Sequence, residues 1–301
     1  MPSFRERLGF VRPLLLDAAM GTELQRRGLD TTLPLWSARA LLDSPEAVAA
    51  IHREEAGAGA DVLTANTFRT HRRTLEKEGL GERAVELTAL AVGLARAAAK
   101  GSGREIYVAG SLSPLEDCYR PDRVPDDAAL DREHREQAES LAAAGADVLL
   151  LETHNTVREL AAAARAAKAT GLPVVASMVT DGTGRLLSGE PIESAVRALA
   201  VLEPDALSIN CVPARRLAFD LSRLSAAAPE VPLGAWGNLG LPEDESGWSF
   251  TDSLSPEAYA DCAKRWLGTG ARIVGGCCGT TPAHTIALRG IIGQETSIAS
   301  P

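Results

Sequence analysis

The sequence predicts one (β/α)8 TIM barrel, an α/β fold, and three observations lead to this prediction. A chain of 301 residues is long for an ordinary domain but typical of one such barrel. Short runs rich in leucine and β-branched residues alternate with helical segments from end to end, without a break in composition. A faint internal repeat also recurs at the expected strands. We therefore expect residues 1–301 to form a single domain.

Each expected strand is a short apolar run, and the expected helices are longer, alanine-rich segments. Ser44, Ser255 and Thr281 each place a capping hydroxyl directly before a proline, which is typical of a helix start. An open, doubly wound sheet is the alternative, but no GxGxxG motif follows the first strand. The strands are expected near 14–16, 61–65, 106–110, 147–151, 173–179, 206–210, 231–236 and 271–275. The helices are expected near 44–58, 82–99, 126–144, 156–170, 192–202, 213–228, 255–268 and 281–292.

The internal repeat begins with Gly-Ala in the runs GADVLTANTF, GADVLLLETH and GARIVGGC. Aligned on this dipeptide, the runs place Asn66, Glu152 and Cys277 at the same point, where a strand ends. Aligning Asp205 with Asp61 adds Asn210 at that point, with Cys211 next. These are strands two, four, six and eight, and alternate strands of a barrel share layers. The repeat therefore predicts polar, metal-capable side chains at the catalytic face.

Composition narrows the classes of partner. A net charge of −9 argues against nucleic acid, because phosphate binding needs a basic surface. The N-terminal MPSFRERLGF lacks the apolar stretch of a signal peptide, and no run of 18 apolar residues predicts a membrane span. We therefore expect a cytoplasmic protein that acts on small molecules. The sequence does not indicate the oligomeric state.

Three of the five cysteines form the sharpest chemical signal. Cys277 and Cys278 lie in GGCCGTTP, where a strand gives way to a helix, and Cys211 ends another strand in SINC. Three thiolates suit Zn²⁺, which is tetrahedral and would keep one position open for substrate. One strand-end cysteine alone would be explained as a small buried hydrophobe, but three favour a metal site. Cys262 lies inside an expected helix and is interpreted as packing, and Cys118 is unassigned.

GGCCGTTP together with INC at 209–211 resembles the zinc signature of the homocysteine S-methyltransferase family. Further similarity covers nearly the whole chain, in LLLDAAMGTELQRRG, TANTF, AGSLSP and LLLETH. The resemblance implies that zinc activates the thiol of homocysteine, which takes a methyl group and becomes methionine. It allows S-methylmethionine, S-adenosylmethionine or betaine as the donor. Departures at Ala18, Ser113, Thr153 and Gly237 bear on the donor rather than on the metal.

An amino-acid substrate also needs partners for its charged ends. We expect Glu152 to bind the ammonium group. Asp17 would assist directly or by holding a loop, with a helix cap as the alternative. The turn at Met20, Gly21 and Thr22 offers backbone N–H groups to the carboxylate.

Two asparagines and two tryptophans complete the expected site. Asn66 belongs to the substrate-binding residues through the repeat, and Asn238 is expected as an oxygen ligand or as a contact to a ligand. Trp36 and Trp248 would wall in a methylated cation, or serve only in packing. Three other functions are left open: methylation of another thiol or selenol, a zinc hydrolase, and a non-catalytic barrel stabilised by zinc. Few histidines argue against the hydrolase, and a structural zinc would need a fourth protein ligand.

Overall fold

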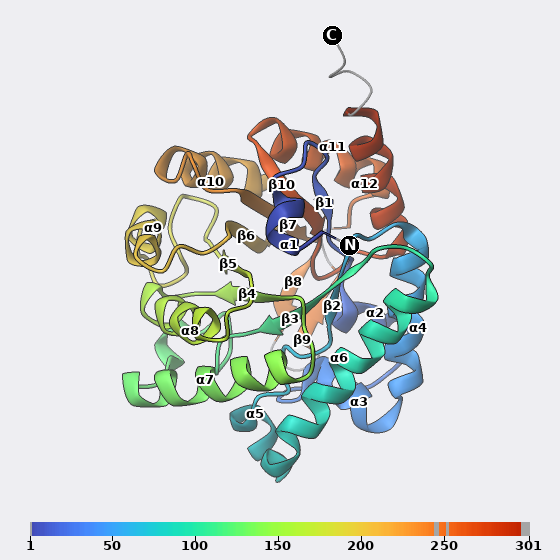
Figure 1. Cartoon of the computed structure of the whole chain (residues 1–301), viewed down its shortest axis with the longest axis vertical. Coiled ribbons are helices and arrows are strands. Elements are labelled where there is room, and N and C mark those ends of the chain that lie inside the picture. The colour runs from blue at the N-terminus through green and yellow to red at the C-terminus, as the bar shows by residue number, and fades with distance from the viewer. Residues whose placement is uncertain (1, 244–246, 251–252, 296–301) are drawn as a thin grey trace.

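The computed structural model describes residues 2–243, 247–250 and 253–295. Within them, eight parallel strands form a sheet in the order β1-β10-β7-β6-β5-β4-β3-β2. A parallel bridge between Leu16 and Val62 joins the first strand to the second and closes the barrel. The strands lie at the centre of the molecule and the long helices surround them (Figure 1). The predicted (β/α)8 barrel is confirmed.

Each predicted strand and helix is present, within a few residues of its expected bounds. The barrel strands are β1 (Leu14–Leu15), β2 (Val62–Ala65), β3 (Tyr107–Leu112), β4 (Val148–His154), β5 (Val174–Met178), β6 (Ala206–Pro213), β7 (Leu233–Asn238) and β10 (Ala271–Gly276). The surrounding helices are α4 (Pro45–Ala58), α6 (Ala84–Gly101), α7 (Asp127–Ala143), α8 (Val157–Ala169), α9 (Ile192–Ala200), α10 (Ala214–Ala227), α11 (Pro256–Gly268) and α12 (Pro282–Glu295).

Helix starts follow the capping signals only in part. The Ser255 hydroxyl accepts a hydrogen bond from the Ala258 N–H and caps α11 as predicted. Ser44 occupies the capping position of α4, but its side chain makes no capping bond there. Proline in the first turn, which both helices have, fixes the start of α4 without the hydroxyl.

The apolar core has two layers. Inside the barrel, side chains such as Leu14, Val62 and Trp236 are buried against one another. Outside it, the strands bury their other face against the helices, where alanine and leucine are the commonest residues; α8 contributes Ala163 and Ala167 to this layer. No described helix is both long and apolar enough to cross a membrane.

Several short elements lie outside the eight strand–helix units of the barrel and were not predicted. The helix α2 (Met20–Arg26) follows β1, and an antiparallel hairpin of β8 (Leu241–Glu243) and β9 (Gly247–Ser249) follows β7. Three more short helices are α1 (Phe4–Leu8), α3 (Arg39–Asp43) and α5 (Arg72–Glu76). The hairpin and α2 both extend from the carboxyl ends of barrel strands, the end of a barrel at which active sites are built.

Candidate metal centre and substrate cavity

Three cysteine side chains meet at the carboxyl ends of the barrel strands. The Sγ atoms of Cys211, Cys277 and Cys278 all lie within 4.8 Å of one another. The Cys211 and Cys278 sulfurs are 3.7 Å apart. The structure therefore brings together the three predicted ligands from two separate strands.

Irregular backbone at both strand ends turns the sulfurs toward one point. In β6 the register shifts between Asn210 and Pro213, and Cys211 has a φ of 54°, a conformation that non-glycine residues rarely adopt. After β10 the chain turns at Gly279, with a φ of 85°, and a Cβ there would collide with the Leu239 carbonyl oxygen. Such strain at a strand end is typical of a functional site, where surrounding structure maintains it.

The three thiols also shift one another's pKa. Hydrogen bonds from Cys277, Cys278 and Tyr119 hold the pKa of Cys211 well below its usual range. Hydrogen bonding to Cys211, together with burial, raises the pKa of Cys277 and Cys278 well above theirs. Close negative charges repel one another, so three thiolates require a cation between them. A divalent metal with a preference for sulfur fits this donor set.

A cavity of about 340 Å³ opens above the cysteines. Its lining includes all three thiols, so one side of the cysteine cluster faces open space. The predicted residues that line it are Asp17, Met20, Gly21, Trp36, Asn66, Glu152 and Trp248. Thr22 and Asn238 lie outside this lining, and both are buried.

Glu152 points a carboxyl group into this cavity from β4. Its Oε2 accepts a hydrogen bond of 2.6 Å from the Ser111 hydroxyl. Burial, supported by the nearby Cys211 thiol, raises the pKa of Glu152 to about 7. A cationic ligand group beside it would favour the ionised form.

Asp17 lies deeper and joins two strands. Its two carboxylate oxygens accept hydrogen bonds of 2.8 Å from the N–H and the hydroxyl of Thr64. Burial and the neighbouring Glu55 raise the pKa of Asp17 well above its usual range. The residue that caps α2 is Ala19, so the alternative of a helix cap for Asp17 is wrong. This placement favours the role of holding the loop after β1.

The comparison with known proteins decides the family. The model of the family described as homocysteine S-methyltransferase matches residues 14–292. The chain belongs to this family. It is 32% identical to the homocysteine S-methyltransferase of Escherichia coli over 295 residues, which cover 92% of this chain and 94% of that protein. It is also 32% identical to the methionine synthase of Mycobacterium tuberculosis, with 96% of this chain matching 25% of that longer protein.

Solved structures of a homocysteine methyltransferase agree with this assignment. The metallated form of MmuM from Escherichia coli matches 95% of this chain and 99% of its own, at a TM-score of 0.82 and 31% identity. The apo form of the same enzyme matches with a TM-score of 0.73 and 30% identity. The oxidized form of the same enzyme matches almost as well as the metallated form, with a TM-score of 0.81 and 31% identity.

In this family member the first turn of α2, which follows β1, contacts the turn that carries Cys277 and Cys278. Thr22 is fully buried, and its hydroxyl accepts a hydrogen bond of 2.9 Å from the Gly279 N–H. A Cβ at Gly21 would overlap the indole of Trp36, so glycine lets that ring lie against the backbone. Substrate binding by Met20, Gly21 and Thr22 stays a prediction, and Thr22 is placed to brace the cysteine loop.

Asparagine amides lie around the cysteines. Asn238 donates to the Cys211 carbonyl at 2.9 Å, and its amide nitrogen is 3.8 Å from the Cys211 sulfur. The Asn210 amide is 3.9 Å from the Cys277 sulfur. Asn66 is further away and donates to the Ser37 carbonyl at 2.8 Å. The amide of Asn238 thus contacts a predicted metal ligand rather than the cavity.

One neighbour of the cysteines was missed by the sequence reasoning. The hydroxyl of Tyr119, in the loop between β3 and α7, lies 3.1 Å from the Cys211 sulfur. The only local hint was its neighbour Cys118, which also lines the cavity. Cys262 is buried within α11 and packs in the core, as predicted.

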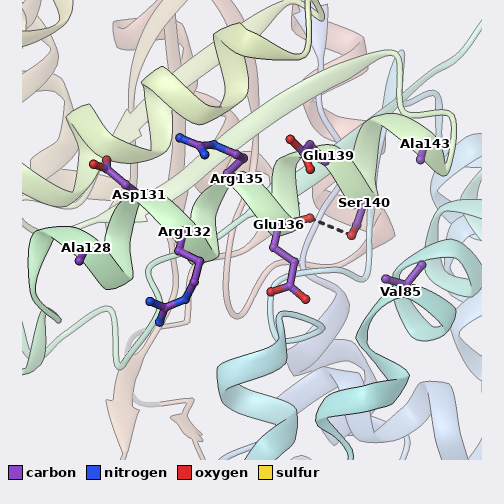
Figure 2. A pocket seen from close by; sticks show the side chains of 9 residues that line it. All are labelled: Val85, Ala128, Asp131, Arg132, Arg135, Glu136, Glu139, Ser140 and Ala143. Atoms are coloured by element: carbon purple, nitrogen blue, oxygen red, sulfur yellow. Dashed lines mark hydrogen bonds between the residues drawn. The ribbon is translucent and has the colours of Figure 1, made fainter.

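A second hollow, of about 630 Å³, lies on the outside of the barrel along α7. Figure 2 shows its lining side chains, which come from α7 except for Val85 of α6. Charged groups of both signs, including Arg132 and Glu136, surround it. It lacks the cysteine cluster and the buried acids, so the chemistry belongs to the cavity at the barrel mouth.

Proposed function

We propose that this chain is a zinc-dependent homocysteine S-methyltransferase, which transfers a methyl group from a small donor to the homocysteine thiol and gives methionine. The observation that carries the proposal is the cysteine cluster at the floor of a cavity that also contains Glu152. We further propose that residues 1–301 act as a single domain. The free cysteines fit a reducing compartment such as the cytoplasm.

Cys211, Cys277 and Cys278 would hold the zinc ion. When bound, zinc supplies a Lewis acid that keeps the acceptor sulfur ionised near neutral pH. The open side of the cluster faces the cavity, which is where an acceptor must enter. A structural zinc site is normally closed by four protein ligands, so this opening supports a catalytic role over a purely structural one.

The acceptor's ammonium group would have a partner in the same cavity. Glu152, once ionised, would bind the ammonium group and aim the thiol at the cluster. Asp17 would hold the loop after β1 in place through Thr64. Ammonium binding by Glu152 would distinguish homocysteine from thiols or selenols that lack an amino group.

The donor would enter from the outer part of the cavity. Trp36 and Trp248 both line it, and a methylated sulfonium or ammonium group is stabilised over an aromatic ring. This supports S-methylmethionine, S-adenosylmethionine or betaine as the donor class. Holding donor and acceptor in line is itself a large part of such a reaction's acceleration.

The test combines metal content with product formation. We expect about one zinc per chain, from a single site, and methionine formation from homocysteine with at least one of the three donors. Cys277→Ser should lose both zinc and activity, whereas Cys262→Ala, at a buried cysteine of α11 outside the cluster, should keep both. Full zinc occupancy in Cys277→Ser would exclude the ligand assignment. If a simple thiol were methylated as fast as homocysteine, homocysteine would be excluded as the specific acceptor.

A further inference from the structure

We propose that Tyr119 is a positioning residue of the metal centre, whose phenol donates a hydrogen bond to the Cys211 thiolate from the cavity side. The inference rests on the proposed function, because it requires the three cysteines to hold a metal. Tyr119 lies outside GGCCGTTP and SINC, the motifs that contain the three cysteines.

Among the described residues, the phenol makes the shortest side-chain hydrogen bond to a cysteine sulfur from outside the cluster. Its oxygen lies 3.1 Å from the Cys211 sulfur, whereas the amide nitrogen of Asn238 lies 3.8 Å from that sulfur. The Asn210 amide is 3.9 Å from Cys277. Tyr119 also lines the cavity, whereas Asn238 is buried outside the lining. Tyr119 therefore borders the side of the cluster through which an acceptor sulfur must approach.

Buried side chains fix the loop that carries this phenol. The fully buried Asn155 donates from its amide to the carbonyls of Asp117 and Cys118, at 3.3 and 2.9 Å. Glu159, also fully buried, accepts a hydrogen bond of 2.8 Å from the Leu115 N–H. The Tyr119 N–H is held by the Asp117 carboxylate at 2.9 Å. The segment just before Tyr119 is thus tied to the end of β4 and the start of α8.

The same strand end therefore sets two parts of the site. β4 carries Glu152 into the cavity, and Asn155 follows this strand directly. A shift of the strand end would move the carboxyl group and the phenol together. This coupling explains how a residue on a long loop keeps a fixed distance from a cysteine on β6.

The hydrogen bond has a chemical use at a thiolate-rich centre. Three thiolates and a divalent ion already carry one net negative charge, and an acceptor thiolate adds another. A neutral donor stabilises this charge without adding a competing cation. It also fixes the orientation of the Cys211 sulfur, as outer hydrogen bonds do for metal ligands in general.

The test uses the full-length protein loaded with metal. Tyr119→Phe removes the hydroxyl and keeps the ring as a wall. We expect zinc to be removed by a chelator at about tenfold lower chelator concentration, the lower end of the effect of losing an outer partner. In cobalt-loaded protein, the thiolate-to-metal charge-transfer band should move to lower energy, because Cys211 then donates more electron density.

Tyr107→Phe is the matched control. It removes one phenol hydrogen bond, of 2.9 Å to the Pro2 carbonyl, in a buried tyrosine at the start of β3. We expect its chelator resistance and its cobalt spectrum to equal those of the wild type. If Tyr119→Phe were indistinguishable from Tyr107→Phe in both measurements, the proposed role would be wrong.

A second variant keeps the phenol and frees its loop. Asn155→Ala should move chelator resistance and the cobalt band in the same direction as Tyr119→Phe, and it decides the matter if Tyr119→Phe does not fold. An unchanged spectrum in Asn155→Ala would then contradict the anchoring. Failure of the wild type to bind metal through its cysteines would instead contradict the proposed function, so the two failures are distinguishable.

Discussion

At the scale of single residues, Glu152 has the most specific expected role. Glu152→Gln keeps the shape of the side chain and removes its charge. We expect kcat/KM for homocysteine to fall by roughly ten- to two-hundred-fold, because a charged hydrogen bond contributes about 1.5–3 kcal/mol. Zinc content should barely change. The variant should also lose the preference for homocysteine over a thiol of similar length without an amino group. Retention of that preference would show that Glu152 is structural.

The pKa of Glu152 gives a pH dependence with a definite sign. Since burial raises this pKa to about 7, the carboxyl group is increasingly protonated below pH 7 and cannot pair with an ammonium group. In the wild type, homocysteine affinity should therefore weaken as the pH falls from 7 to 5, by about tenfold per unit once protonation dominates. The ratio of wild-type to Glu152→Gln affinity should shrink toward one over this range. A ratio independent of pH would contradict ammonium binding by the ionised form.

At the scale of elements, the turn after β10 depends on one glycine. Gly279→Ala places a Cβ against the Leu239 carbonyl at a positive φ. We expect a loss of roughly 2–5 kcal/mol in the free energy of unfolding, from left-handed backbone and overpacking together. Zinc should be lost with it, because the turn carries Cys277 and Cys278. Denaturant unfolding and metal analysis measure the two effects.

Gly93→Ala is the matched control for this substitution. Gly93 lies on the exposed face of α6, and a Cβ there meets no atom within 4 Å. Alanine should stabilise the helix by about 0.5–1 kcal/mol, because glycine loses more backbone freedom on folding. Equal effects of the two substitutions would contradict a special demand at Gly279.

The elements that were predicted carry a clear apolar pattern. The eight strands are continuous apolar runs because both of their faces are buried, and the eight long helices extend over enough residues for apolar positions to recur. The helix α2 and the hairpin β8–β9 are too short for this, and the loop of Tyr119 has no period at all. Its position depends on Asn155, whose bonds reach back across the chain to residues 117 and 118. Such a contact has no local sequence signature.

In the site, too, features with a local sequence signal were predictable, and features that depend on distant segments were not. The cysteines were predictable because GGCCGTTP and SINC place thiols where strands end. The repeat correctly put Asn66 and Glu152 at the cavity. The left-handed backbone of Cys211, in contrast, follows from the register shift of β6 against β7, which is a property of the pair of strands. The bond from the Gly279 N–H to Thr22 likewise joins two ends of the chain.

At the scale of the whole molecule, two buried titratable groups have opposite effects on how stability depends on pH. Burial raises the pKa of Glu55 to about 7, so the folded state binds its proton more tightly than the unfolded state does. The resulting stabilisation is present below about pH 4.5 and is lost as the pH rises to 7. Burial lowers the pKa of His52 to about 4, so its contribution is lost in the opposite direction, as the pH falls from 6.5 to 4.

Glu55→Gln isolates one of these contributions. Glu55 is buried in α4 and accepts a hydrogen bond of 2.7 Å from the Thr285 hydroxyl, which glutamine can still accept. The unfolding free energy of the variant relative to the wild type should increase by roughly 1–3 kcal/mol from pH 4.5 to 7, then stay constant. Urea unfolding at several pH values measures it. Glu54→Gln, on the exposed part of the same helix, controls for the loss of one charge from α4. If the stability of Glu55→Gln relative to the wild type did not change with pH, the expectation would be contradicted.

The pairing of β1 with β10 has a consequence for how the protein is made in the cell. A ribosome delivers Cys211 first and Cys278 67 positions later, and β10 must then find β1, which was synthesised near the start. Until that happens, a nascent chain offers isolated thiols rather than a binding site. The proposed zinc ion can therefore bind only after β10 is synthesised, and the thiol of Cys211 must stay reduced until then.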